Sequence, residues 1–178
     1  MNGLGLELGL AALILVVFFA GLFSRSEEKS GIGLLSAVGT LVLFVVSLFV
    51  EPGGSLFGGA FVLDPLALFA KRLFLLTTVI GTLGSRSLKE RAFGRRAVEY
   101  HLLLFFSLLG MMVLASAREL ILLFVAFELM SIPLYVLAGF LKREADQVEA
   151  ALKFFLVGTV SSAIMAYGLS FLYGVART

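Results

Sequence analysis

Cysteine is absent from this 178-residue chain, and histidine occurs once, as His101. Without cysteine the chain cannot form a disulfide, ligate an iron–sulfur cluster or bind zinc through thiolates. The sequence also lacks an HExxH motif, a P-loop and a GxGxxG that opens a helix after a strand, so nothing in it indicates nicotinamide or flavin binding. We expect the chain to hold no metal ion and no cofactor of its own.

Charged residues are also scarce. They make up 15% of the chain, against 60% hydrophobic residues, whereas a soluble domain is nearer a quarter charged and half apolar. The apolar residues fall in successive runs of about 20, the length that a helix needs to cross a bilayer core about 30 Å thick. The first run follows Met1 without a basic segment or cleavage site, so we expect it to stay in the mature protein.

The sequence therefore predicts an all-α membrane protein, a single domain over residues 1–178 with about six transmembrane helices. The expected helices span about residues 4–23, 31–50, 61–84, 97–116, 118–141 and 147–173. The apolar stretch from Leu102 to Leu141 is too long for one crossing, so the chain must turn near residues 116–118. The segment EPGGSLFGG (51–59) has the proline and glycines of a loop.

The loops after the first, third and fifth expected helices hold most of the basic residues. These are Arg25, Lys29, Arg86, Lys89, Arg91, Arg95, Arg96, Lys142 and Arg143. The alternate loops carry only Arg118, and Arg177 follows the last helix. Because short loops rich in Lys and Arg stay in the cytoplasm, we expect these loops inside and the amino terminus outside.

Glu128 is the leading candidate for chemistry. It lies in the apolar segment LLFVAFELMSIPLYVLAGF, and at 1.5 Å per residue its position is near mid-membrane. Ionisable groups inside a bilayer are costly and usually functional, and a carboxylate held between desolvation and a cationic neighbour can exchange a proton. The structural alternative is a glutamate that only hydrogen-bonds to a neighbouring helix.

Ser131 and Tyr135 follow Glu128 by three and seven residues, on the same helix face. Lys142 continues this face to the cytoplasmic end. Hydroxyl groups at this spacing can hold waters that lead from the cytoplasm to the carboxylate. Pro133 removes one backbone hydrogen bond and is expected to bend the helix near Glu128.

Other charged residues within apolar runs have two interpretations each. Lys153 can relay protons, or it can pair locally with Glu149 four residues earlier or extend to the interface. Lys71 and Arg72 either face a polar interior, or the third helix starts later and residues 64–70 are interfacial. His101, near the start of the fourth expected helix, is typical of an interfacial hydrogen-bonding residue.

The segments ELMSIPLYVLAGF (128–140) and EAALKFFLVGTVSSAIMAYGLSFLYG (149–174) resemble the N-type membrane subunit of proton-pumping NADH–quinone oxidoreductase, respiratory complex I. They are similar more broadly to the antiporter-like subunits shared with multi-subunit sodium/proton antiporters. The glutamate followed by S-x-P-L-Y, then E-A-A-x-K-x-F with S-S and Y-G, fits the N type better than the L or M types. Residues 101–124 also fit, and residues 64–74 fit more loosely.

The resemblance implies that the chain is the amino-terminal part, about half, of a fourteen-helix antiporter-like fold. It matches Glu128 with a fifth-helix glutamate whose ion pair gates proton movement, and Lys153 with a sixth-helix lysine of the same pattern. Quinone reduction elsewhere in the complex would be coupled to proton translocation, with FMN and iron–sulfur clusters in partner subunits. The chain would be a non-redox subunit of this translocase, with no activity alone.

The resemblance also implies K-, M- and L-type membrane subunits as partners, in the lipid bilayer of a bacterial plasma (inner) membrane, and no nucleic acid. One alternative is a subunit of a multi-subunit cation/proton antiporter that uses an existing gradient. Another is a truncated, purely structural membrane subunit. Co-purification with flavin and iron–sulfur proteins favours complex I, and their absence favours the antiporter.

Overall fold

The computed structural model describes residues 3–23, 30–88, 96–140 and 145–176 of the chain. The described residues form six α-helices, each long and apolar enough to cross a membrane. This confirms the predicted all-α membrane fold. The helices are α1 (Gly5–Phe23), α2 (Ser30–Leu48), α3 (Pro65–Leu88), α4 (Ala97–Ser116), α5 (Leu120–Ala138) and α6 (Ala145–Ala176).

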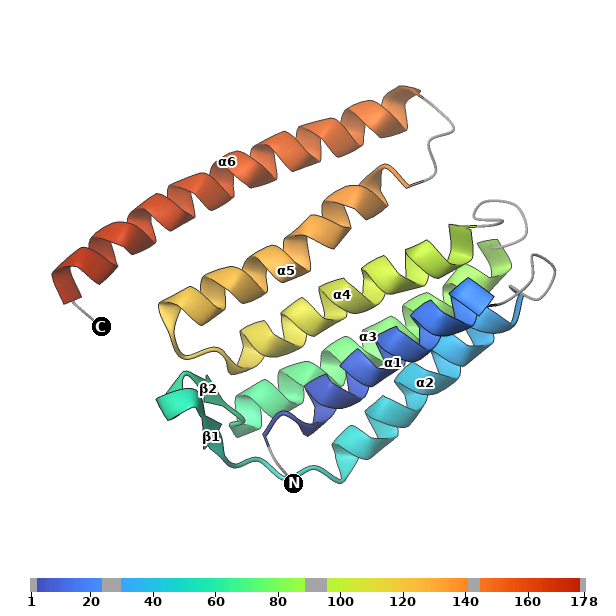
Figure 1. The fold of residues 1–178 in the computed structure, drawn as a ribbon, viewed down its shortest axis with the longest axis horizontal. Coiled ribbons are helices and arrows are strands. Elements are labelled where there is room, and N and C mark those ends of the chain that lie inside the picture. The colour runs from blue at the N-terminus through green and yellow to red at the C-terminus, as the bar shows by residue number, and fades with distance from the viewer. Residues whose placement is uncertain (1–2, 24–29, 89–95, 141–144, 177–178) are drawn as a thin grey trace.

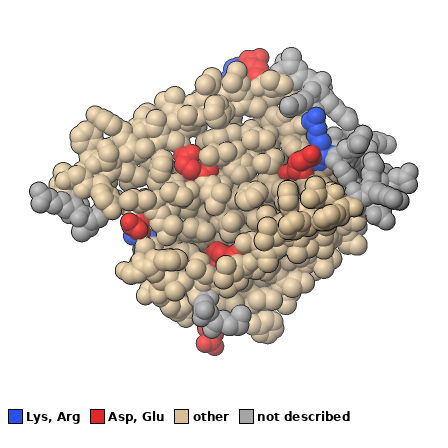
Figure 2. Space-filling view, in the orientation of Figure 1, with Lys and Arg blue, Asp and Glu red and all other residues tan. Residues whose placement is uncertain are grey.

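Helices α1, α2, α3 and α4 form a four-helix group, and α5 and α6 are added on one side of it (Figure 1). Helices α1 and α3 each pack against both α2 and α4, while α5 packs on α4 and α6 on α5. Buried apolar side chains from α1, α3 and α4 fill the centre of the group. Most of α6 is exposed. The face shown in Figure 2 is largely uncharged, with isolated charged side chains, as expected of a surface against lipid.

The predicted start of the third helix, at residue 61, is wrong. Phe61–Val62 form strand β2, which pairs antiparallel with strand β1, Ser55–Leu56. A 3₁₀ turn, η1 (Phe57–Gly59), connects the two strands. Helix α3 begins only at Pro65, because the Asp64 carboxylate accepts a hydrogen bond from the Ala67 N–H at 2.6 Å and caps the helix.

The predicted ends of the second, third, fifth and sixth helices also need correction by a few residues, and α3 ends at Leu88 instead of residue 84. Helix α2 ends at Leu48 instead of residue 50. Helix α5 runs from Leu120 to Ala138 rather than over 118–141, because the Arg118 N–H donates to the Ala60 carbonyl at 2.8 Å instead of entering a helix. Helix α6 extends beyond the expected 147–173 at both ends.

Single cysteines test the predicted orientation, since the chain has none of its own. Ser55 in β1 and Glu99 in the first turn of α4 are both exposed, and they belong to opposite ends of the bundle (Figure 1). With the amino terminus outside, a membrane-impermeant maleimide should label Ser55→Cys in intact cells, and Glu99→Cys only after permeabilisation. The reverse pattern would contradict the argument from loop charge.

Candidate functional site

Glu128 lies in the ninth position of α5, whose helical hydrogen-bonding pattern continues past Pro133. Its side chain is partly buried, and its Oε1 atom is buried without a hydrogen-bond partner among the described residues. A glutamate that served only to join two helices would use its oxygens for bonds between them. Glu128 thus presents an unsatisfied acceptor within the membrane-spanning part of the bundle, which is costly unless water or a cation reaches it.

Ser131 and Tyr135 are both buried on α5. The Ser131 hydroxyl donates to the Phe127 carbonyl of its own helix at 2.7 Å, which leaves its oxygen lone pairs for other donors. The Tyr135 hydroxyl lies against Gly158 of α6, where any larger residue would collide with it. Lys142, the last residue of the predicted stripe, lies outside the described residues.

Lys153 forms an ion pair with Glu149 at 2.5 Å, and both side chains are more than half exposed. This is the local pairing that the spacing of four residues predicts. Gly139, which directly follows α5, packs on Ala151 of α6. Because the two helices are antiparallel, Lys153 is level with a position on α5 about nine residues, or about 14 Å, from Glu128. The structure does not bring Lys153 and Glu128 together.

A second buried charge lies in the four-helix group. The Lys71 ammonium of α3 is 2.6 Å from the Glu7 carboxylate of α1, with side-chain exposures of 0% and 5%. The Lys71 nitrogen also lies 4.8 Å from the centre of the Phe61 ring. Lys71 therefore faces the interior, as one of the two predictions for it states. Glu7 was missed by the sequence analysis, although an acidic residue inside an apolar run is a signal that could have identified it.

Arg72, next to Lys71, has a structural contact. Its guanidinium donates to the carbonyls of Ser47, at 3.1 and 3.0 Å, and of Val50, at 3.1 Å. The last carbonyls of a helix lack partners within it, so Arg72 satisfies the carbonyls at the end of α2.

His101 is fully buried in α4, with its Nδ1 atom 2.6 Å from the Ala97 carbonyl. It faces the bundle interior, close to the amino-terminal end of α4.

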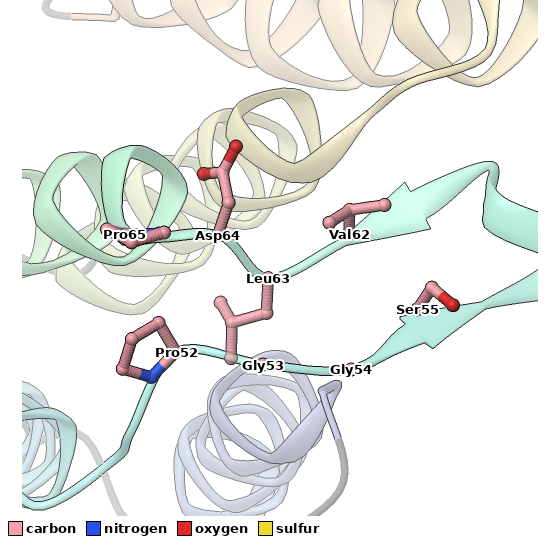
Figure 3. Close-up of a pocket in the computed structure, with 8 residues that line it drawn as sticks. All are labelled: Pro52, Gly53, Gly54, Ser55, Val62, Leu63, Asp64 and Pro65. Atoms are coloured by element: carbon pink, nitrogen blue, oxygen red, sulfur yellow. The ribbon is translucent and has the colours of Figure 1, made fainter.

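Strands β1 and β2 form a hairpin at one end of the bundle, which we call the hairpin end. There, Arg118 pairs with Asp64. The Ala67 N–H bond, aided by the nearby Arg118 charge, holds the pKa of Asp64 below its usual value, while burial acts in the opposite direction. Asp64 also lines an open hollow of about 560 Å³ between the hairpin and the start of α3 (Figure 3). Its other lining residues are uncharged: Pro52, Gly53, Gly54, Ser55, Val62, Leu63 and Pro65.

None of these groups forms a metal centre in the part of the chain that the structure describes, where no three His, Cys, Asp or Glu side chains cluster. The arrangement instead consists of carboxylates and ammonium groups buried among apolar helices. Such groups can bind and release protons, and they can pair with each other across helix boundaries.

Known membrane proteins match this chain in sequence. The family described as NADH:quinone oxidoreductase/Mrp antiporter, TM, matches residues 117–178. F(420)H(2) dehydrogenase subunit N of Methanosarcina mazei is 38% identical over 97% of this chain, and NADH-quinone oxidoreductase subunit N of Rhodospirillum rubrum is 39% identical over 97%. The chain covers 36% of each relative, so it spans about a third of their length and not the half inferred from the resemblance.

Among solved structures, a chain of respiratory complex I from Thermus thermophilus with bound aureothin has a similar fold. Its TM-score is 0.77 at 32% sequence identity, and the match covers 95% of this chain and 36% of that one. The likeness therefore extends over nearly all of the six-helix bundle, well beyond the two segments in which the sequence resemblance is strongest.

Proposed function

Because this chain belongs to the N-type, antiporter-like membrane subunits of the NADH–quinone oxidoreductase family, we propose that it translocates protons as part of such a subunit, coupled to quinone reduction elsewhere in the complex. The observation that carries the proposal is Glu128, a membrane-embedded carboxylate whose buried Oε1 atom has no partner among the described residues. A group with an unmet acceptor in an apolar setting is suited to take up a proton.

In this proposal Glu128 is the proton-carrying group. Ser131 and Tyr135 line the approach from the cytoplasmic end, because both are buried on α5 between Glu128 and that end. Lys153, paired with Glu149 near the cytoplasmic end of α6, relays protons toward this approach. The chain's own residues supply proton transfer only. Electron transfer, with FMN, iron–sulfur clusters and quinone, belongs to partner subunits, so the chain is a non-redox part of a translocase.

The same proposal assigns partners and location. Helix α6 is exposed along nearly its whole length, so further helices of the subunit or of neighbouring K-, M- and L-type subunits are proposed to cover part of it. We place the assembly in a bacterial plasma membrane. The relatives differ in the electron donor that their names give, F(420)H(2) or NADH. This difference is understandable if the part that they share handles protons.

A cation/proton antiporter is the second candidate, since the matching family description names Mrp antiporters beside quinone oxidoreductases. Affinity purification of the tagged chain from its native membrane, followed by mass spectrometry and cofactor analysis, separates the two. We expect flavin- and iron–sulfur-containing subunits to co-purify. Recovery of hydrophobic antiporter subunits alone, without flavin or iron, would favour the antiporter and contradict the redox-coupled proposal.

A further inference from the structure

The ion pair between Glu7 and Lys71 lies outside the Glu128 site and is almost completely buried. Removing two charges from water is expensive, and a buried pair is often no more stabilising than apolar residues of similar volume. Stability alone is therefore a weak reason for its presence. The Glu7 Oε2 atom is buried and has no hydrogen-bond partner among the described residues, so the pair retains an acceptor that a proton or a water molecule can use.

A line of alternating charges connects this pair with the surface at the hairpin end. Asp64 precedes Lys71 by seven residues, two turns on the same face of α3, or about 10 Å. Asp64 in turn pairs with Arg118, whose side chain is more than half exposed. From the core outward the order is Glu7, Lys71, Asp64 and Arg118.

Glu7 also lies at about the depth of Glu128. Gly21 of α1 packs on Val98 of α4, so Glu7, fourteen residues earlier in the antiparallel helix, is level with Met112. Gly110 of α4 packs on Met130 of the antiparallel α5. Glu128, two residues before Met130, is therefore also level with Met112, two residues after Gly110. The two carboxylates therefore occupy one layer of the bundle, on opposite sides of α4.

We propose that Glu7 and Lys71 form a second protonatable site in this subunit, which exchanges protons with water at the hairpin end by way of the Asp64 carboxylate. Arg118 stays protonated and holds Asp64 at that end. The inference extends the proposed function and rests on it only for the direction of net proton flow. A proton from water binds the Glu7 carboxylate and neutralises it. The Lys71 ammonium, still protonated, loses its counter-ion and turns on its flexible stem toward Asp64. When Glu7 returns the proton to water, the original pair forms again.

Two variants test the proposal in the assembled complex. The double variant Glu7→Gln/Lys71→Gln removes both charges and keeps hydrogen-bonding side chains, so neither partner is left as an isolated charge. We expect it to assemble and to lower proton translocation at least about tenfold. Asp64→Asn leaves the buried pair intact and interrupts the route to the surface, so it should give a smaller loss. Glu119→Gln, a carboxylate-to-amide change in the exposed turn before α5, is the matched control.

A second measurement does not depend on pumping. Infrared titration of the purified complex in lipid nanodiscs should show a carboxylic-acid C=O band that is lost in Glu7→Gln/Lys71→Gln and retained in Glu119→Gln. An unchanged band, or a double variant that translocates protons as well as Glu119→Gln does, overturns the second site. If the double variant does not assemble, translocation by Asp64→Asn equal to that of Glu119→Gln overturns it. Normal translocation in Glu128→Gln would instead contradict the role proposed for Glu128 and leave the infrared result to decide about Glu7.

Discussion

Replacing Glu128 with glutamine is expected to abolish proton translocation while the complex still assembles in normal amount. Glutamine has nearly the volume of glutamate and can both donate and accept hydrogen bonds, but it cannot bind and release a proton near neutral pH. Within the described residues the Glu128 Oε1 atom makes no hydrogen bond, so the substitution breaks no bond that this part of the structure shows. The loss should therefore fall on proton transfer and leave folding intact.

The measurements are the amount of complex in the membrane, the rate of quinone reduction and the rate of proton uptake into inverted vesicles. We expect both rates to fall together, by about a hundredfold or more if the relay is obligatory. A complex that contains Glu128→Gln and pumps at the normal rate would show that the carboxylate is structural. Glu128→Ala is less informative, because removing the side chain can strand a cationic partner and disturb assembly by itself.

Sequence reasoning predicted the six helices because the physical requirement is local. A helix that crosses lipid needs about 20 apolar residues in a row, and each of the six runs meets that requirement by itself. The start of α3 failed for the opposite reason. Phe61 and Val62 continue the apolar run, but strand pairing with residues 55–56 and a bridge to Ala117 determine their conformation. Of these contacts, the bridge to Ala117 lies far away along the chain.

The charged residues show the same division. The pair of Lys153 with Glu149 follows from a spacing of four residues, so the sequence was enough to propose it. The partner of Lys71 is 64 residues away on another helix, and only the packing of α1 and α3 around α2 and α4 brings Glu7 to it. Long-range pairing of single charges has no periodic signal in one sequence.

Gly110→Ala is expected to destabilise the protein by about 2 kcal/mol, although the same exchange in a helix is normally favourable by about 1 kcal/mol. At this glycine, α4 packs directly against the backbone of α5. A methyl group on Gly110 would lie 2.7 Å from the Met130 Cα and 2.8 Å from the Leu129 carbonyl carbon. These are backbone atoms, which cannot rotate away as a side chain does, so the helices must separate.

Gly81→Ala on α3 is the matched control, because a methyl group there would have no atom within 4 Å. The two variants should therefore differ in the midpoint of thermal unfolding in lipid nanodiscs. Gly110→Ala should lower the midpoint, and Gly81→Ala should raise it slightly or leave it unchanged. Equal midpoints would contradict the close packing of α4 on α5. The contact also affects the proton site, since Met130 is only two residues from Glu128. A displaced α5 should thus lower proton translocation in Gly110→Ala even where the complex still assembles, whereas Gly81→Ala should translocate normally.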